Sequence, residues 1–327
     1  MWNFLIRVNK KLVLAIPIMM TAGFIFGISV DAGLLRQLKT LIVPLTFLMV
    51  YPMMVTLNIK HLQDGIKNLG LQATTQFINF AVIPFIAFGM GLFFFRDNPY
   101  MALGLLLTAL LPTSGMTISW TGFAKGNVAA AINMTVIGLT VGSLATPVYV
   151  MGLMGTKVDI NLIMVVKQIV FIVFLPMFLG FMTRQWIISR VGQPEFKKNW
   201  APRFPSLSTI GVLGIVFVAI ALKAATIAAD PTVLMKIIVP VFLIYLVNFT
   251  LSTVTGKLLF TRDDAIALVY GTVMRNLSIA LAIAINAFGA RGAETALVIA
   301  LSYIIQVQAA AWYVKFTDAI FGQPEAG

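Results

Sequence analysis

The sequence has no cysteine and a single histidine, His61. Disulfide bonds, thiolate nucleophiles and thiolate metal ligands are therefore excluded. His61 falls in a predicted loop, where we expect a solvated side chain without a special role. The chain also lacks a glycine-rich loop that ends in Lys-Ser or Lys-Thr, so it does not power transport by holding ATP phosphates itself.

Charged residues are scarce as well. They make up 10% of the 327 residues, whereas hydrophobic residues make up 60%. Soluble domains average about 25% charged residues, so the composition predicts an all-α integral membrane protein. Each transmembrane helix needs about 20 predominantly apolar residues. Ten stretches meet this requirement and are numbered here as spans one to ten: 11–29, 38–57, 70–95, 100–121, 127–150, 161–184, 205–229, 232–259, 263–288 and 292–317. We expect the first span to be retained, because no small-residue cleavage site follows it.

The net charge of +12 is unevenly distributed over the connections between spans. Ten spans place both termini on one side of the membrane. That side carries fourteen basic residues: Arg7, Lys10, Lys11, Lys60, Lys67, Lys125, Arg184, Arg190, Lys197, Lys198, Arg203, Lys257, Arg262 and Lys315. The other side carries six: Arg36, Lys39, Arg96, Lys157, Lys236 and Arg291. The positive-inside rule therefore predicts cytoplasmic termini in the plasma (inner) membrane. The expected partners of this charge are anionic lipid headgroups of the bilayer, not nucleic acid.

Short motifs indicate an internal repeat. Gln76–Phe80 in span three resembles Tyr245–Phe249 in span eight. We therefore predict two repeats of five spans each, residues 1–150 and residues 151–327. Because five is an odd number, the second repeat must be inverted in the membrane, which is the usual plan of secondary transporters. A chance match of short apolar motifs is the alternative.

Two corresponding segments of the repeats combine helix breakers with small polar residues in mid-span. Leu111–Thr117 in span four contains Pro112, which removes a backbone donor and clashes with the preceding turn. Tyr270–Asn276 in span nine contains Gly271, which weakens a helix. Broken helices at equivalent positions point to the binding site of a transporter. Unwound backbone at that depth survives only where it lines a cavity or is buried in protein. Two ordinary kinks are the alternative.

Arg275 lies within the apolar stretch Ala265–Phe288, and an ionised side chain at membrane depth costs about 2.5–3.5 kcal/mol on insertion scales. The spans offer it no carboxylate away from their ends. Such a residue marks a functional site by default, so we predict that Arg275 binds an anion. The structural alternative is that it bonds to carbonyls freed at a broken helix. An intramembrane enzyme is not expected, because the spans lack the nucleophile, base or metal ligands that its chemistry needs.

At these segments the chain resembles the bile acid:sodium symporter superfamily, and within it most closely the arsenite permease branch. The resemblance covers most of spans three to five and eight to ten. It rests on the order and spacing of five motifs: Pro112–Trp120, Lys125–Asn127, Asn79 ahead of Pro84, Gly256–Leu259 and Asn276–Gly289. It implies ten spans arranged as a panel (one, two, six and seven) and a core (three to five and eight to ten), with broken spans four and nine crossing. Substrate would bind in the cleft between panel and core, near that crossing.

The chain departs from both branches at positions that the resemblance makes functional. Where the arsenite branch has a cysteine in span four and glutamates in spans nine and ten, this chain has Thr113, Ser278 and Gln306. A hydroxyl cannot replace a soft thiolate towards trivalent arsenic. Where the sodium-coupled branch has a glutamate and a glutamine in span nine, this chain has Gly271 and Arg275. The carboxylate that favours binding of a hard cation is therefore missing.

We therefore predict a secondary transporter that moves a small organic anion by alternating access without the usual sodium sites, with Arg275 in place of the coupling cation. An arsenite or metalloid permease and a transporter-derived sensor are the alternatives. The candidate substrate-binding residues are Arg275, Asn276, Thr113, Ser114, Thr117, Asn133 and Gln306. The candidate remnants of an ion site are Asn79, Thr135, Gly271 and Asn248. We expect no cofactor and no metal site, sodium binding is not favoured because the carboxylate is missing, and the sequence does not indicate an oligomeric state.

Some of these residues have a second interpretation. Asn79 and Asn248 either brace the crossing as a symmetric pair or line the site. Gln306 and Gln308 either line the cleft or form hydrogen bonds between helices. Lys223, near the end of a span, is expected to extend to the lipid headgroups.

Overall fold

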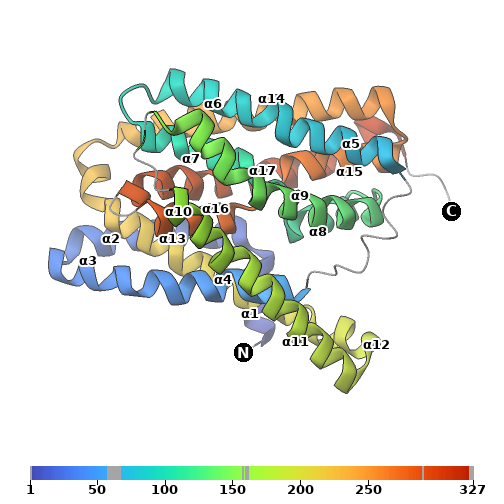
Figure 1. Ribbon diagram of the computed structural model, residues 1–327, viewed down its shortest axis with the longest axis horizontal. Coiled ribbons are helices and arrows are strands. Elements are labelled where there is room, and N and C mark those ends of the chain that lie inside the picture. The colour runs from blue at the N-terminus through green and yellow to red at the C-terminus, as the bar shows by residue number, and fades with distance from the viewer. Residues whose placement is uncertain (1, 57–67, 157, 159–161, 289–290, 324–327) are drawn as a thin grey trace. The chain divides into compact units, whose positions relative to one another are not determined.

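The computed structural model describes residues 2–56, 68–156, 158, 162–288 and 291–323. These residues are almost entirely helical, and the β-structure found among them is an isolated bridge between Pro112 and Arg275. Figure 1 shows the helices with their labels. The all-helical class predicted from the sequence is therefore confirmed.

Within the described residues, six helices are long and apolar enough to cross a membrane: Leu69–Phe94, Val128–Met154, Val165–Val191, Gln193–Ala229, Thr232–Leu259 and Gly292–Phe321. Four shorter apolar helices accompany them: Leu14–Ser29, Ile42–Thr56, Pro99–Leu110 and Leu277–Ala287. The structure and the sequence thus agree on a protein built from membrane-spanning helices. The count of ten spans and the inverted repeat stay predictions.

The chain forms two compact units, and each unit takes segments from both halves of the sequence. The first draws on Met1–Leu57, Ile160–Met235 and Ser278–Ala300. Its elements are α1 (Trp2–Lys10), α2 (Leu12–Ser29), α3 (Ala32–Leu38), η1 (Lys39–Leu41), α4 (Ile42–Thr56), α10 (Leu162–Ile169), η6 (Val170–Phe174), α11 (Leu175–Val191), α12 (Gln193–Glu195), η7 (Phe196–Trp200), α13 (Arg203–Ala229) and α16 (Leu277–Ala287). The predicted division into repeats 1–150 and 151–327, like that into panel and core, stays a prediction.

Close helix packing dominates the first unit, where α13 packs against both α2 and α4. A Cβ atom on Gly27 of α2 would lie 2.4 Å from Ala221 O, and one on Gly211 of α13 would lie 2.4 Å from Met49 N. Small residues let the backbones approach, which is how helices associate in lipid without a hydrophobic driving force.

Lys223 of α13 has a protein partner in the first unit. Its Nζ lies 3.2 Å from Glu294 Oε1, near the start of α17 (Gly292–Phe321). The ion pair lies near the ends of two predicted spans, so the expectation that Lys223 extends to the headgroups stays a prediction. The apolar pattern of α13 does not reveal which acid the fold brings next to it.

The second unit draws on Asn58–Asp159, Lys236–Leu277 and Leu301–Gly327. Its elements are α5 (Leu69–Phe77), η4 (Ile78–Val82), α6 (Ile83–Phe94), α7 (Pro99–Leu110), α8 (Gly115–Phe123), α9 (Val128–Tyr149), η5 (Val150–Met154), α15 (Arg262–Val273) and the greater part of α14 (Thr232–Leu259) and α17. Every residue of the candidate site discussed below lies in this unit.

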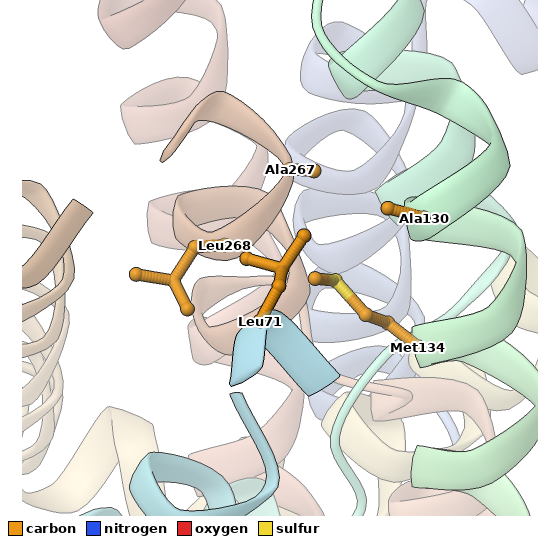
Figure 2. Close-up of a cluster of buried hydrophobic side chains, with 5 residues drawn as sticks. All are labelled: Leu71, Ala130, Met134, Ala267 and Leu268. Atoms are coloured by element: carbon orange, nitrogen blue, oxygen red, sulfur yellow. The ribbon is translucent and has the colours of Figure 1, made fainter. Parts of the chain in front are cut away.

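A buried apolar cluster holds α5, α9 and α15 together (Figure 2). It consists of Leu71, Ala130, Met134, Ala267 and Leu268. One turn further along α15, a Cβ atom on Gly271 would lie 2.5 Å from Met134 Sδ. Gly271, predicted as a remnant of an ion site, is thus a position of close helix packing.

Two apolar helices contain a π-helical turn shortly before a proline. η4 precedes Pro84 in α6, and η6 precedes Pro176 in α11. A proline ring crowds the preceding turn and donates no backbone hydrogen bond, and a π turn is one local adjustment to that conflict. Asn79 lies on η4, so the π turn sets the direction of its side chain.

Candidate functional site

Helical conformation is interrupted twice around the candidate site. α7 ends at Leu110 and α8 begins at Gly115, while α15 ends at Val273 and α16 begins at Leu277. Both interruptions fall in the segments where the sequence combines helix breakers with small polar residues. An interruption at membrane depth frees backbone groups that need partners within the protein.

The two interruptions pair with each other through their backbones. Thr113 N–H donates to Met274 O, and Asn276 N–H donates to Leu111 O, each at 2.7 Å. These bonds flank the bridge between Pro112 and Arg275. The segments therefore satisfy part of each other's freed backbone, as a short antiparallel ladder does.

Gln306 of α17 completes the backbone pairing. Pro112 and Arg275 face each other as a pair that exchanges no backbone hydrogen bond. The missing N–H of Pro112 therefore removes no bond from the ladder, and the N–H and C=O of Arg275 need another partner. Gln306 Oε1 accepts from Arg275 N–H at 2.8 Å, and Gln306 Nε2 donates to Arg275 O at 3.2 Å. The hydroxyl of Tyr245 also donates to Gln306 Oε1, at 2.8 Å. In this conformation the Gln306 amide binds the backbone of Arg275, as an interhelical hydrogen-bonding residue.

Two asparagines close the last turn of α15. Asn79 Nδ2 donates to Gly271 O at 3.0 Å, and Asn248 Nδ2 donates to Thr272 O at 2.9 Å. Carbonyls at the end of a helix have no intrahelical partner. These bonds support the bracing interpretation of Asn79 and Asn248.

The start of α8 uses two of the candidate substrate-binding residues as caps. Ser114 Oγ accepts from Met116 N–H at 3.2 Å, and Thr117 Oγ1 accepts from Ser114 N–H at 3.1 Å. This is a capping box, in which two side chains satisfy the backbone donors of a helix start. Ser114 and Thr117 therefore fix the direction in which α8 leaves the interruption.

Thr113 is fully buried and has a backbone φ of 65°. This left-handed conformation is unusual for a β-branched residue and stores strain. Its Oγ1 donates to Pro112 O at 2.6 Å and lies 3.3 Å from Thr135 O. Thr135 Oγ1 bonds within α9 to Ala131 O at 2.7 Å. Both hydroxyls, predicted as parts of a site, are thus engaged by backbone.

Arg275 is only 3% exposed and is held from one side. Its Nη1 donates to Ala109 O, near the end of α7, at 3.0 Å. Its Nη2 is buried without a hydrogen-bond partner in the described part of the chain. None of the ion pairs found among the described residues includes it. A cation near the C-terminal end of a helix is favourable, but the second nitrogen remains unsatisfied.

A small cavity adjoins this guanidinium. Its lining consists of Ile83, Thr108, Ala109, Ile244, Tyr245, Asn248 and Arg275. Its volume of about 10 Å³ is room for about one water molecule. Of the residues predicted from the sequence, Arg275 and Asn248 line it. Thr108 and Tyr245 were not predicted, and the available signal for Tyr245 was its place in the repeat motif.

A protein-family model with the description "Sodium Bile acid symporter family" matches residues 43–230, more than half of the chain. The chain belongs to this family. The superfamily resemblance noted in the sequence is thereby confirmed, and as a family member the protein is an integral membrane transporter.

Two of the similar proteins are named arsenical-resistance proteins. The chain is 22% identical over 305 residues to the arsenical-resistance protein Acr3 of Corynebacterium glutamicum, and the matched region covers 88% of this chain and 82% of the relative. It is 23% identical over 208 residues to the arsenical-resistance protein Acr3 of Alkaliphilus metalliredigens, and the match covers 60% of this chain and 58% of the relative. It is 24% identical over 239 residues to the uncharacterized protein YbaS of Bacillus subtilis, and that match covers 71% of this chain and 74% of the relative.

The family name raises the question of a sodium site. Three amide oxygens on one face of α5 and η4 are buried without partners in the described part of the chain: Gln72 Oε1, Gln76 Oε1 and Asn79 Oδ1. The sequence analysis missed the two glutamines, although their spacing of four residues was visible. Asn133 Oδ1 on α9 is likewise without a partner. Hard cations favour carboxylate oxygens, and no cluster of three acidic, histidine or cysteine side chains occurs among the residues described. Amide oxygens are also ligands of hard cations, so this set supplies oxygen donors but not the negative charge of a carboxylate.

Proposed function

We propose that this protein is a secondary transporter that carries a small organic anion across the cytoplasmic membrane without requiring sodium. The observation that supports it is the guanidinium of Arg275. It is buried, one nitrogen binds Ala109 O, and another nitrogen has no partner among the described residues. The same residue lines a cavity. The substrate supplies the negative charge that this site lacks.

The chemistry of the guanidinium favours an anion with paired oxygens. Arginine presents several N–H groups in a planar fork that matches a carboxylate or an oxyanion. Leaving a buried charge without a partner is costly. The bond from Nη1 to Ala109 O at 3.0 Å holds the fork in place, so that binding an anion requires little reorganisation.

The size of the cavity implies that the protein changes conformation during transport. About 10 Å³ holds a water molecule but not an organic anion, because small-molecule sites measure about 300–1,000 Å³. Alternating access opens and closes such a site on each side of the membrane in turn. The cavity beside Arg275 is then the closed form of the binding site.

A fixed guanidinium also argues against sodium coupling at this site. Two unit charges of the same sign about 4 Å apart repel by about 4 kcal/mol at an effective dielectric constant near 20. The unpartnered buried amide oxygens on α5, η4 and α9 are neutral, and they do not offset that repulsion as a carboxylate would. Arg275 therefore takes the electrostatic role of a coupling cation.

Export of a metalloid is the second candidate, and the names of two relatives favour it. Thr113 stands where the arsenite branch is expected to have a cysteine. Its hydroxyl is hard, is directed to backbone oxygens at 2.6 and 3.3 Å, and cannot act as a thiolate ligand of trivalent arsenic. We therefore rank the organic anion first.

The test is flux in proteoliposomes. The wild-type protein and the variants Arg275→Gln and Arg275→Lys are reconstituted, and uptake of radiolabelled organic acids, a bile salt and arsenite is measured in sodium and in potassium buffers. We expect the wild type to carry an organic acid equally well in both buffers. Arg275→Gln should lose this flux because the charge is gone, and Arg275→Lys should retain part of it.

Folding of each variant is checked by tryptophan fluorescence during thermal unfolding. Flux that depends strictly on sodium would contradict the proposal, and so would equal flux by wild type and Arg275→Gln. A ligand that stabilises the wild-type protein without any flux would instead indicate a sensor.

A further inference from the structure

The buried charge of Arg275 needs a partner in this conformation as well as in the substrate-bound one. Arginine stays protonated in proteins, and an unpaired buried charge is costly. The ion pairs found among the described residues do not include Arg275, and the described residues that line its cavity include no acid. An organic anion is too large for about 10 Å³. Charge balance in this conformation therefore favours a smaller anion.

The volume of the cavity restricts the identity of that anion. About 10 Å³ is room for about one water molecule. Phosphate, sulfate and carboxylates contain several heavy atoms and exceed this size. Chloride is a single atom only slightly larger than a water molecule, and it is the common anion of that size.

Two side-chain nitrogens of the lining residues are suited to hold an anion. Arg275 is 3% exposed, and its Nη2 is buried without a hydrogen-bond partner in the described part of the chain. Asn248 Nδ2 carries two N–H groups and donates to Thr272 O at 2.9 Å, so a second N–H group remains available. Hydrogen bonds from a charged donor to an anion are the strong ones, so the guanidinium is the main contact.

The rest of the lining strengthens the dependence on Arg275. The hydroxyls of Thr108 and Tyr245 already donate hydrogen bonds within the protein, at 2.6 and 2.8 Å. The other lining residues are apolar: Ile83, Ala109 and Ile244. Attraction between opposite charges is stronger in such low-dielectric surroundings than in water. Charge on Arg275 and the size of the cavity together thus determine what binds.

We propose that this cavity binds one chloride ion as the counter-ion of Arg275, and that the organic anion displaces it during transport. The displacement rests on the proposed function, whereas chloride binding needs only the cavity and the guanidinium. Chloride balances the charge while the cavity is too small for substrate, and the substrate takes its place when the cavity opens. Transport is then an exchange, which is electroneutral for a monovalent organic anion.

Chloride binding is tested by thermal unfolding of the purified full chain in detergent, followed by tryptophan fluorescence. Potassium gluconate is replaced stepwise by potassium chloride, because gluconate is too large for the cavity and the ionic strength stays constant. We expect chloride to raise the unfolding temperature of the wild type by binding the folded state. In Arg275→Gln the half-saturating chloride concentration should rise about tenfold or more, because the attracting charge is gone. Arg96→Gln removes an exposed charge elsewhere and should behave as wild type.

Ile244→Val keeps the charge and enlarges the cavity, so it decides the matter if Arg275→Gln does not fold. Iodide is larger than chloride, and it should stabilise the wild type less than chloride does. In Ile244→Val the ratio of the half-saturating iodide concentration to that of chloride should fall, by up to about tenfold for one methyl group. Ile215→Val removes the same group from a buried isoleucine of the first unit and should leave the ratio unchanged.

Exchange is tested in proteoliposomes that contain either chloride or gluconate. Internal chloride should raise the initial rate at which the organic acid is taken up, and equal rates would overturn the exchange. Chloride that stabilises the wild type no better than gluconate would overturn the site, and so would equal stabilisation of Arg275→Gln. Because unfolding is measured without flux, a missing chloride effect beside sodium-independent flux overturns this inference alone. A chloride effect without any flux overturns the proposed function alone.

Discussion

Arg275 is bound at its backbone and at one nitrogen of its side chain. Gln306 takes both peptide groups, and Ala109 O takes Nη1. The sequence leaves open whether Arg275 bonds to carbonyls freed at a broken helix or binds an anion. Both roles are compatible, because they use different groups of the same residue. The bonds that close the interruption also hold Arg275, whose Nη2 has no partner among the described residues, in the lining of the cavity.

Replacing Gln306 by leucine should destabilise the protein. The change leaves Arg275 N–H and O buried without their partners, and each unsatisfied buried group costs about 1–3 kcal/mol. We expect a loss of about 2–4 kcal/mol in the free energy of unfolding, measured by denaturant-induced loss of helical circular dichroism in detergent. Transport should fall as well, because the direction of the Arg275 side chain depends on its backbone.

Gln308→Leu is the matched control for this prediction. It makes the same change on the same helix, but Gln308 is exposed, so the substitution should be neutral or stabilising in an apolar environment. Equal destabilisation by both variants would show that the loss reflects glutamine in α17 in general and not the bonds to Arg275.

Sequence reasoning at the residue scale identified Arg275, because a charge in an apolar span is visible without a fold. It did not assign Gln306 to the backbone of Arg275, 31 positions away, because that partnership exists only once α17 packs beside the interruption. The pairing of Lys223 with Glu294 was missed for the same reason.

Among the elements, α9 holds the interruption between α7 and α8 by presenting two glycines to it. A Cβ atom on Gly138 would lie 2.7 Å from Thr113 Oγ1, and one on Gly142 would lie 2.9 Å from both Leu110 O and Pro112 Cδ. The left-handed conformation of Thr113 is thus enclosed by a helix surface that has no side chains at these two positions.

Gly142→Ala should therefore destabilise the protein although alanine is the better helix former. The new methyl group meets backbone at less than van der Waals distance, and overpacking of this kind costs about 1–3 kcal/mol. Gly89→Ala in α6 is the control, because a Cβ atom there meets nothing within 4 Å, and it should gain about 0.5–1 kcal/mol. Thermal unfolding followed by tryptophan fluorescence measures both. A stabilised Gly142→Ala would contradict the close contact between α9 and the interruption.

Prolines at the element scale show what local sequence can and cannot predict. Pro112 coincides with a complete interruption, whereas Pro84 and Pro176 follow π turns inside continuous helices. Each proline predicts a local disturbance. The size of that disturbance depends on whether another segment can bind the freed backbone, as Met274 and Asn276 do beside Pro112. The partners that bind this backbone lie more than 160 residues away along the chain, so the local pattern does not reveal them.

At the scale of the whole molecule, each compact unit combines segments from both halves of the chain. Helices that are distant in sequence must therefore be inserted before either unit can close. The orientation in which they enter the membrane depends on the basic residues of the connections, since lysine and arginine near the ends of spans favour the cytoplasmic side. The basic residues behind the net charge of +12 are therefore expected to determine how the helices are oriented during insertion.

The absence of cysteine makes this orientation directly measurable. Asn199→Cys, in η7, and Asp97→Cys, between α6 and α7, each introduce a single thiol at an exposed position and leave every lysine and arginine in place. The charge distribution predicts that position 199 is cytoplasmic and position 97 is external. In intact spheroplasts a membrane-impermeant maleimide should label only the thiol at position 97, and permeabilisation should make the thiol at position 199 reactive. Labelling of position 199 in intact spheroplasts would reverse the assigned orientation, because acidic residues contribute little to it and the basic residues are unchanged.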